Sequence, residues 1–541
     1  MIAAFWIPWL ALLAPVLLGS AAFVPASVAN RRVRTMRGAA LGLAATSFVL
    51  ALIAAAGCAF FGKVALAAPD LGGISAGILI DALSATILVL ISFLGLVIVR
   101  YANSYLAGDP NQGEFLKWLS ATLASAMCIV LAGDLFVLTV AWIFTSRCLH
   151  HLLVFYPDRP AALRAARTKR IITRTGDLCL AAAVVMCVRA FGTTGFQEIF
   201  AALRSGVSPE AMGSVHLIAV LLMGGAVLKS AQFPFHSWLP ETMETPTPVS
   251  ALMHAGIVNA GGYLMIRMSP LVSLSEDTMR LLTVIGLVTT VYGGVVMMTQ
   301  VSVKRVLAYS TVGQMGFMLL QCGLGCFSTA VLHIVAHSLY KAHAFLSSGS
   351  AVGVRTNLPA SSAPGAMALS LMLRLAPAVG GVLVYVLFVR SIPGLPNAGS
   401  TILGLLVLIA SGQWLAGFCR RGLSVGVIAW GIAGVCTLFT LYAALSAGFA
   451  RMLGGVVAYG STASTGPAWA VGIGLVFVGL VTLQVLWPFL QRFSSARAWY
   501  VHVYNGLYVS TLANSFAERF FPARDAARMA PAFCGPPGGI R

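Results

Sequence analysis

The chain has 541 residues, of which 59% are hydrophobic and 9% are charged. A soluble protein of this length would be about a quarter charged, so the composition excludes an ordinary water-soluble protein and predicts an all-α polytopic membrane protein. The formal net charge of +19 does not indicate nucleic-acid binding, because the arginines lie between apolar runs and no basic patch is interleaved with base-stacking aromatics.

Apolar runs of the length that crosses a bilayer, roughly 20 residues each, recur along the chain. They predict about fifteen transmembrane helices, roughly 14 to 16. The first run, "FWIPWLALLAPVLL", has no basic segment before it and is expected to be a retained helix rather than a signal peptide. The runs begin near Ala4, Ala39, Ile78, Leu119, Leu135, Leu178, Val215, Val249, Leu281, Val306, Ala330, Ala366, Ile402, Val425 and Val471.

Two basic segments predict the orientation. Residues 31–37 follow the first run and residues 159–174 follow the fifth, so both lie on one side if the spans alternate. Loops rich in lysine and arginine remain in the cytoplasm. We therefore expect a multi-pass protein of the bacterial cytoplasmic (inner) membrane with a periplasmic N-terminus.

Changes in composition divide the chain into four parts. We expect N-terminal transmembrane helices in 1–74, an ion-conducting core in 75–355, C-terminal transmembrane helices in 356–492 and an interfacial tail in 493–541. A Pro/Ser/Ala-rich linker, "TNLPASSAPGA", begins the third part. In the tail, "WYVHVYN" at 499–505 is typical either of an aromatic belt at the bilayer surface or of a strip that docks a partner protein.

The stretch "KSAQFPFHSWLPETMETPTPVSALMHAG" at 229–256 interrupts the apolar pattern with four prolines, Pro234, Pro240, Pro246 and Pro248. Proline lacks an N–H and clashes with the preceding helical turn, so a discontinuous helix is expected. Irregular backbone at membrane depth is tolerated where it is buried in protein or lines a wet cavity. The sequence therefore predicts a cavity through which something passes.

The lysines are distributed differently from the arginines. Six of the 34 basic residues are lysines, and Lys229, Lys304 and Lys341 lie within or at the edges of apolar runs. A desolvated lysine can lose its proton, whereas arginine cannot. We interpret Lys229 and Lys341 as proton-exchanging groups, with snorkelling to the bilayer surface as the alternative for one of the three.

The segment "VLHIVAHSLYKAHAF" places His333, His337 and Lys341 four residues apart. This spacing predicts a stripe along one helix face, with about 6 Å between neighbours. Because histidine titrates near neutral pH, the stripe is a candidate proton relay, and His254 is a further buried candidate. A hydrogen-bonded core histidine is the alternative for any single one of them.

The candidate acid partners for these bases are few. Asp177 and Glu244 are the first candidates to hold the proton of Lys229, and Glu241 and Asp81 are the others. Asp134 lies in the turn "LAGDLF", where it is expected to do no more than cap the next helix.

Cys322, Cys326, His333 and His337 have a spacing that resembles a zinc site. Structural zinc sites are usually built in compact soluble modules, whereas these residues span two apolar runs. We therefore expect no metal site, no cofactor and no catalytic residue on this chain.

Three segments carry a resemblance to a known family. "LLMGGAVLKSAQFPFHSWLPETMETPTPVSALMHAG", "VSVKRVLAYSTVGQMGFM" and "HIVAHSLYKAHAFLSSGS" resemble the antiporter-like proton-translocating subunits of respiratory NADH:quinone oxidoreductase and of multisubunit Na⁺/H⁺ antiporters, over residues 75–350. The resemblance implies inverted repeats, discontinuous helices and a row of protonatable groups at the membrane midplane. The residues that it assigns to the ion route are Lys229, His254, Lys304, His333, His337 and Lys341.

The chain departs from that family at two points. The fifth span carries Ile143 where the family has a glutamate that partners the broken-helix lysine, and Arg147, His150 and His151 follow it. The long lateral helix of the largest such subunits is not expected after residue 492. The central ion pair of the family is therefore absent or rebuilt.

Two further segments, "HAGIVNAGGYLMIRMSPL" and "YVHVYNGLYV", resemble the membrane subunit of DAB inorganic-carbon transporters. That resemblance implies a large peripheral DabA-like partner with a zinc-dependent β-carbonic-anhydrase fold, which would carry the chemistry and the zinc. It implies that a cation gradient, H⁺ or Na⁺, powers one-way hydration of CO₂ to bicarbonate. The alternative is a proton- or Na⁺/H⁺-translocating subunit of a complex I-like or Mrp-like assembly.

Overall fold

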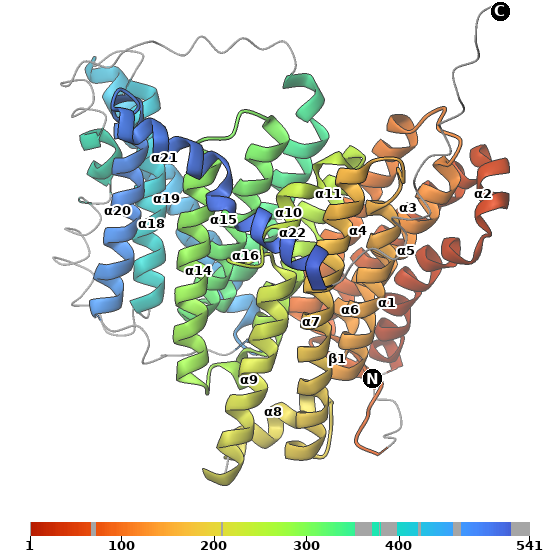
Figure 1. The fold of residues 1–541 in the computed structure, drawn as a ribbon. Coiled ribbons are helices and arrows are strands. Elements are labelled where there is room, and N and C mark those ends of the chain that lie inside the picture. Colours follow the sequence, from red (N-terminus) through yellow and green to blue (C-terminus); the bar gives the residue numbers. More distant parts are fainter. Residues whose placement is uncertain are drawn as a thin grey trace, which may run out of the picture.

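The computed structural model describes residues 2–66, 72–206, 209–351, 371–377, 379, 398–419, 424–457 and 467–520. Within them, eleven helices are long and apolar enough to cross a membrane. Helices α15, α16 and α18 stand beside these eleven (Figure 1), so the prediction of an all-α membrane protein is confirmed. The predicted linker at 356–366 and most of the run expected from Ala366 lie outside the described residues.

The first third of the chain forms a bundle of long helices. A short antiparallel hairpin of β1 (Val64–Leu66) and β2 (Ile78–Ile80) connects two of them and is the exception to the all-α prediction. The helices are α1 (Ile2–Ser20), η1 (Ala21–Phe23), α2 (Ala26–Arg31), α3 (Val33–Phe61), α4 (Ala82–Tyr105), α5 (Gln112–Leu131), α6 (Leu135–Leu153) and α7 (Pro160–Phe191).

Local sequence signals explain where several of these helices begin. The Asp81 side chain accepts from the backbone N–H of Ser84, and the Ser84 hydroxyl accepts from the N–H of Asp81, which makes a capping box at the start of α4. The Asp134 carboxylate accepts from the N–H of Val137 at 2.7 Å and caps α6, as predicted. Pro160 occupies the first turn of α7, where its missing N–H costs no hydrogen bond.

The basic segment at 159–174 was expected to be a loop, and the structure corrects this. Helix α7 begins at Pro160, so most of the basic segment is helical. The reason is that its residues repeat with helical spacing, and Lys169, Thr173 and Gly176 all fall on the buried side of α7.

The centre of the chain contains the predicted discontinuous helix. Helix α9 (Pro209–Lys229) stops at Lys229, and α11 (Thr247–Ala255) starts only after the proline-rich segment. A second break, η3 (Ile257–Asn259), separates α11 from α12 (Ala260–Arg267). The neighbouring elements are α8 (Phe196–Arg204), α10 (Trp238–Glu241), η2 (Thr242–Glu244), α13 (Ser269–Val272), α14 (Glu276–Met297), α15 (Val303–Gly323), α16 (Phe327–Leu346) and η4 (Ser348–Ala351).

Small residues allow the central helices to approach closely. A Cβ added to Gly286 on α14 would lie 2.4 Å from the Leu320 nitrogen, and one added to Gly293 would lie 2.5 Å from the Gly313 nitrogen. The α14–α15 pair therefore packs backbone to backbone. Helix α15 also packs against α16, which carries the histidine stripe.

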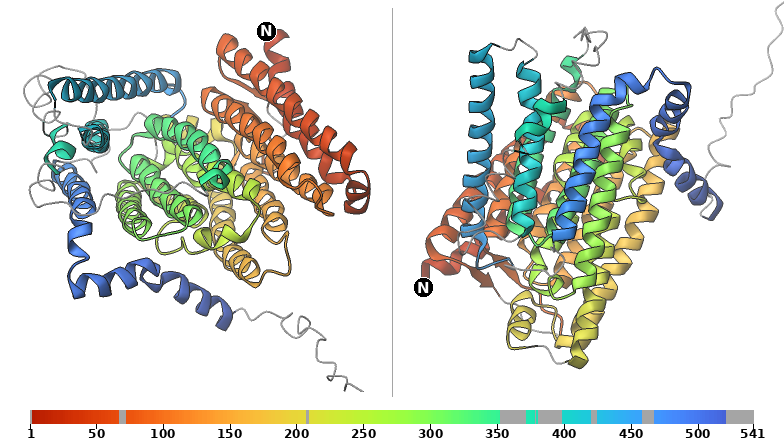
Figure 2. Two further views of the ribbon diagram at one scale, coloured as in Figure 1. Left: turned by 90° about the horizontal axis from the view of Figure 1, so that it is seen from above. Right: turned by 90° about the vertical axis from the view of Figure 1, so that its left-hand side faces the viewer.

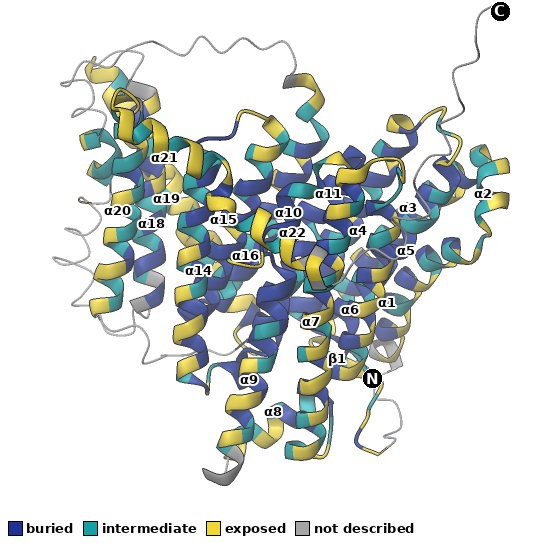
Figure 3. Ribbon diagram, in the orientation of Figure 1, coloured by how far each residue is buried: buried dark blue, intermediate teal, exposed yellow. Residues whose placement is uncertain are grey.

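The last described helices differ in burial. Helices α18 (Ala398–Cys419), α19 (Val425–Leu453) and α20 (Pro467–Leu490) stand at one edge of the bundle. The apolar windows of α19 and α20 are 11% and 17% buried, against 72% for α5. Buried residues accordingly concentrate in the central helices (Figure 3).

The C-terminal tail runs along the flank of the bundle (Figure 2). It consists of α21 (Ser494–Tyr504), η7 (Gly506–Tyr508) and α22 (Val509–Phe520), which are each too short to be the long lateral helix. The Tyr500 hydroxyl donates to the Thr299 carbonyl at 3.1 Å, and the Gln300 amide donates to the Tyr504 carbonyl at 3.0 Å. Part of the predicted aromatic strip therefore docks on its own chain, while Trp499 stays 63% exposed.

The two basic segments lie at the same end of the bundle, as expected for alternating spans. Asn30 at the end of α2 donates to the Asn111 side chain at 3.3 Å. The loop that contains Asn111 also holds Asp109, which accepts from the Tyr156 hydroxyl just before α7 at 3.2 Å. The chain is thus a multi-pass protein whose basic segments share one end.

Candidate functional site

The break after α9 buries Lys229 between three helices. Its ammonium donates to the Ser146 hydroxyl and to the Trp142 carbonyl, the latter at 3.4 Å. It also lies 4.6 Å from the centre of the Trp142 ring, within the range of a cation–π interaction. Lys229 is 3% exposed, so a charge on it is stabilised by dipoles and a ring rather than by a contacting carboxylate.

A second lysine that the sequence reasoning missed lies next to Lys229. The Lys169 ammonium donates to the Ser146 carbonyl at 3.1 Å, so both lysines bind the same residue of α6. Lys169 is 2% exposed, and the charges of the two lysines interact. Positive charges on the two ammonium groups therefore repel each other. Its helical spacing with Thr173 and Gly176 was the signal that could have revealed its burial.

Asp177 is the acid that serves this pair. Among the candidate acids, it is the one whose charge interacts with Lys229, and it also interacts with Lys169. Close packing of α7 on α9 brings it there, since a Cβ added to Gly176 would lie 3.3 Å from the Leu228 Cβ. An acid on the neighbouring helix α7 therefore acts on Lys229, while position 143 of α6 is the apolar Ile143.

Helix α16 presents the predicted stripe on its inner side. The His333 and His337 rings are 5.8 Å apart, and the Lys341 ammonium donates to the Leu307 carbonyl on α15 at 3.0 Å. Lys341 is fully buried and His337 is 5% exposed. His254 on α11 is fully buried and close enough for its charge to interact with those of Lys341 and His337.

The ring nitrogens of these histidines are mostly unsatisfied. Within the described residues, neither nitrogen of His254 or His337 has a hydrogen-bond partner. His333 uses Nδ1 to bind the Gln321 side chain at 2.8 Å. Buried polar groups normally have partners, so these nitrogens are unsatisfied polar groups inside the bundle.

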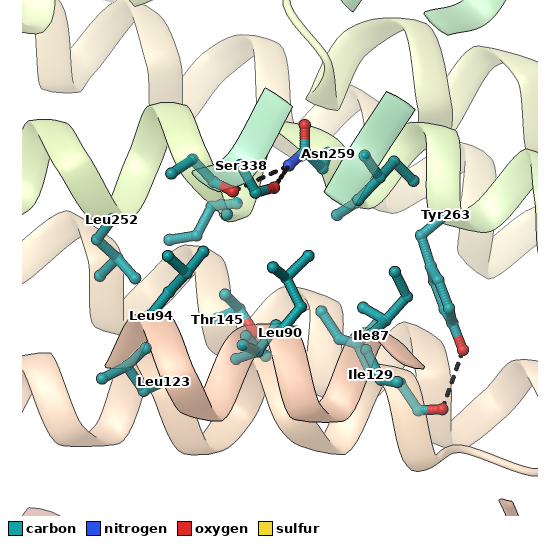
Figure 4. A pocket seen from close by; sticks show the side chains of 18 of the residues that line it. Ile87, Leu90, Leu94, Leu123, Ile129, Thr145, Leu252, Asn259, Tyr263 and Ser338 are labelled. Atoms are coloured by element: carbon teal, nitrogen blue, oxygen red, sulfur yellow. Dashed lines mark hydrogen bonds between the residues drawn. The ribbon is translucent and has the colours of Figure 1, made fainter. Parts of the chain in front are cut away.

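An apolar cavity of about 60 Å³ separates the Lys229 cluster from α16 (Figure 4). Leucine and isoleucine side chains of α4 and α5 form its floor, and Asn259 and Ser338 lie above it. The Asn259 amide donates to the Ser338 hydroxyl at 2.8 Å and to the Ala255 carbonyl at 3.0 Å. Apolar cavities of this kind tend to be dry, so an apolar gap separates the two polar clusters.

The other predicted site residues lie elsewhere. Asp81 forms a buried ion pair with Arg267, with oxygen–nitrogen distances of 2.5 and 3.1 Å, and so does not face a relay lysine. Glu244 is exposed and lies 3.8 Å from Arg159. Lys304 occupies the first turn of α15 and is partly exposed.

Glu241 contacts the C-terminal tail rather than a lysine. The Asn514 amide of α22 donates to both carboxylate oxygens of Glu241, at 2.9 and 3.1 Å, and accepts from the Thr168 hydroxyl at 2.7 Å. Burial raises the pKa of the Glu241 carboxyl. The tail is thereby fixed both to the broken-helix segment and to α7.

Two more buried groups were not predicted from the sequence. His236 in the break is fully buried, and its ring is 4.4 Å from that of Tyr292. Arg267 is 2% exposed and was read only as part of a motif. In the described part of the chain no three His, Cys, Asp or Glu side chains converge as a metal site would require.

Comparison with known proteins shows the family of the chain. Residues 132–419 match the family described as NADH:quinone oxidoreductase/Mrp antiporter, TM, and residues 70–116 match the N-terminus of chain 5 of complex I. The chain is 34% identical over 462 residues to the probable inorganic carbon transporter subunit DabB of Hydrogenovibrio crunogenus, covering 84% of this chain and 85% of that one. The chain belongs to the DabB family of inorganic carbon transporter subunits.

Other relatives are consistent with membership of this DabB family. The chain is 43% identical to the probable inorganic carbon transporter subunit DabB2 of Halothiobacillus neapolitanus over 343 residues, which are 63% of this chain and 62% of that relative. A chain of the Mrp complex from Dietzia sp. DQ12-45-1b superimposes with a TM-score of 0.54 at 24% identity, covering 96% of this chain and 57% of that chain. That likeness shows the antiporter-like fold.

Proposed function

We propose that this DabB-family chain is the ion-conducting membrane subunit of a two-subunit inorganic-carbon transporter. A cation gradient, with H⁺ as the cation, drives its partner to hydrate CO₂ in one direction, so that bicarbonate accumulates. The partner is a DabA-like peripheral subunit with a zinc-dependent carbonic-anhydrase fold, and the hydration chemistry belongs to it. The chain itself acts in the bacterial cytoplasmic membrane, with its basic end in the cytoplasm.

The observation that carries this proposal is the row of ionisable groups inside the bundle, five of them buried and two, Asp177 and His333, half-buried. Lys169, Lys229 and Asp177 form one cluster, and a second cluster on α11 and α16 holds His254, His333, His337 and Lys341. Buried ionisable groups in membrane helices are expensive and are retained for function. Two proton-exchanging clusters with a wettable gap between them are what a gated proton path needs.

The chemistry of the two clusters favours H⁺ over Na⁺. Hard cations bind to clustered carboxylate and carbonyl oxygens. The first cluster has two lysines for one carboxylate, and the second consists of histidines and lysine. Such groups exchange protons but repel a metal cation. This supports the carbon-transporter proposal over Na⁺/H⁺ antiport.

The energetics allow one proton to drive the reaction. Each unit charge that crosses 100 mV releases about 2.3 kcal/mol. Raising the bicarbonate pool tenfold costs about 1.4 kcal/mol. A single proton per CO₂ hydrated would therefore be sufficient at an ordinary membrane potential.

The test uses the chain together with its partner in cells that lack other carbon-uptake systems. We expect bicarbonate accumulation that is abolished by a protonophore and unaffected by removal of sodium. Lys341→Ala should abolish accumulation while the partner still co-purifies, because the lysine faces inward and away from the surface. Accumulation that persists in the protonophore would contradict the proposal, and sodium-dependent pH changes in inverted vesicles would favour antiport instead.

A further inference from the structure

A second, larger cavity of about 240 Å³ lies between α6 and α7, beside the Lys229 cluster. Arg147 and His150 line it from α6, and Lys169, Arg170 and Arg174 line it from α7. Asp177 is the one carboxylate among its lining residues. These five side chains, with His151 as a sixth, are permanent or potential cations around a space whose lining contains a single acid.

The arginines of this cavity have no protein partner in the described residues. Among the described ion pairs and side-chain hydrogen bonds, none involves the guanidinium of Arg147, Arg170 or Arg174. The charge of Asp177, the one acid of the lining, interacts with that of Arg174, so the cavity keeps an excess of positive charge. A guanidinium presents its donors as a planar fork that matches a carboxylate, bicarbonate or phosphate.

Deeper in the cavity two donors also face the space. Lys169 lines the cavity and is 2% exposed. One of its three N–H donors binds the Ser146 carbonyl. The Nδ1 atom of His150 is buried without a partner in the described residues. Its neighbour His151 is held in place by stacking on Trp118, with ring centres 3.8 Å apart.

Snorkelling explains part of this cluster but not all of it. An exposed arginine can extend along a helix to reach the bilayer surface. This would explain the position of each of the three arginines taken separately. It does not account for a fully buried lysine and a buried histidine nitrogen on the inner wall of the same cavity. The combination is typical of a site that binds an anion.

We propose that the cavity between α6 and α7 binds an oxyanion, held by the forks of Arg147, Arg170 and Arg174 and by the inner donors of Lys169 and His150. The oxyanion is either bicarbonate from solution or the phosphate of an anionic lipid headgroup. The bound anion lies beside Ser146, whose hydroxyl accepts a hydrogen bond from Lys229. It therefore stabilises a positive charge on Lys229. The proposed anion site does not depend on the proposed function, because the experiment below measures anion binding and not transport.

The test compares the full chain in nanodiscs with two variants. Arg170→Gln/Arg174→Gln removes two forks whose side chains have no described partner, so the fold should persist, with an unchanged melting temperature. Arg189→Gln is the control, because Arg189 is exposed at the far end of the same helix and does not line the cavity. The readouts are the line width of ¹³C-bicarbonate at pH 8 in phosphatidylcholine nanodiscs and the lipids retained in native mass spectrometry from nanodiscs that contain cardiolipin.

Each result decides between the two sources or against the site. If bicarbonate is the ligand, its line broadens with the unmodified chain and the control, and the double variant binds at least about tenfold more weakly. If a lipid is the ligand, bicarbonate is not broadened, and the double variant loses an anionic lipid that the other two retain. Equal binding of both probes to all three proteins would overturn the proposal.

Discussion

Replacing Lys229 by arginine separates the charge of this residue from its ability to release a proton. The Lys229 ammonium contacts Ser146 and the carbonyl of Trp142 and lies over the Trp142 ring. A guanidinium can make the same types of contact, since arginine stacks on aromatic faces and donates to oxygens. We therefore expect Lys229→Arg to insert, fold and retain its partner.

The expected loss of activity follows from intrinsic acidity. The unperturbed pKa of arginine lies about two units or more above that of lysine. At pH values well below both, the neutral fraction of the side chain is therefore at least about 100-fold smaller in the variant. If each transported proton must leave Lys229, ion flux and carbon accumulation fall by at least that factor.

The assay measures ¹⁴C-bicarbonate accumulation in cells and proton flux in inverted vesicles that contain the complete assembly. Lys63→Arg is the matched control, because Lys63 is exposed beyond the end of α3. Immunoblotting and partner co-purification confirm equal assembly. Flux within tenfold of the unmodified chain in Lys229→Arg would refute the relay role of Lys229.

Three further predictions concern stability and the partner. Asp81→Asn leaves Arg267 buried without its counter-charge and should lower the free energy of unfolding by about 3–5 kcal/mol. Adding Arg267→Met should restore much of the lost stability. A change under about 1 kcal/mol in denaturant titration would contradict this prediction. Burial raises the pKa of the Asp134 carboxyl from 3.8 to about 6. The unfolded chain therefore loses this proton at a lower pH than the folded chain, so stability should fall as pH rises from about 4 to about 6. Asp134→Asn should remove this pH dependence of thermal unfolding, and an unaltered pH dependence would exclude the effect. Deleting residues 499–541 should leave the spans folded but release the partner, and full co-purification would place the docking surface elsewhere.

Local patterns in the sequence were sufficient for several features of the structure. The prolines of the broken segment had to end α9, because they remove helical hydrogen bonds wherever the chain folds. The spacing of His333, His337 and Lys341 placed them on one face of α16, since helical geometry alone brings residues four apart together. The cap formed by Asp134 likewise depends only on its nearest neighbours.

Contacts between helices could not be predicted in the same way. Asp81 and Arg267 are 186 positions apart, and the charge of Asp177 acts on Lys229 because Gly176 lets α7 approach α9. Helix α9 is apolar all round, so its pattern does not indicate which face meets α7. The acid that serves Lys229 and the burial of Lys169 were therefore decided by the packing and rotation of the helices, which depend on side-chain shape across the interface and not on periodicity along the chain.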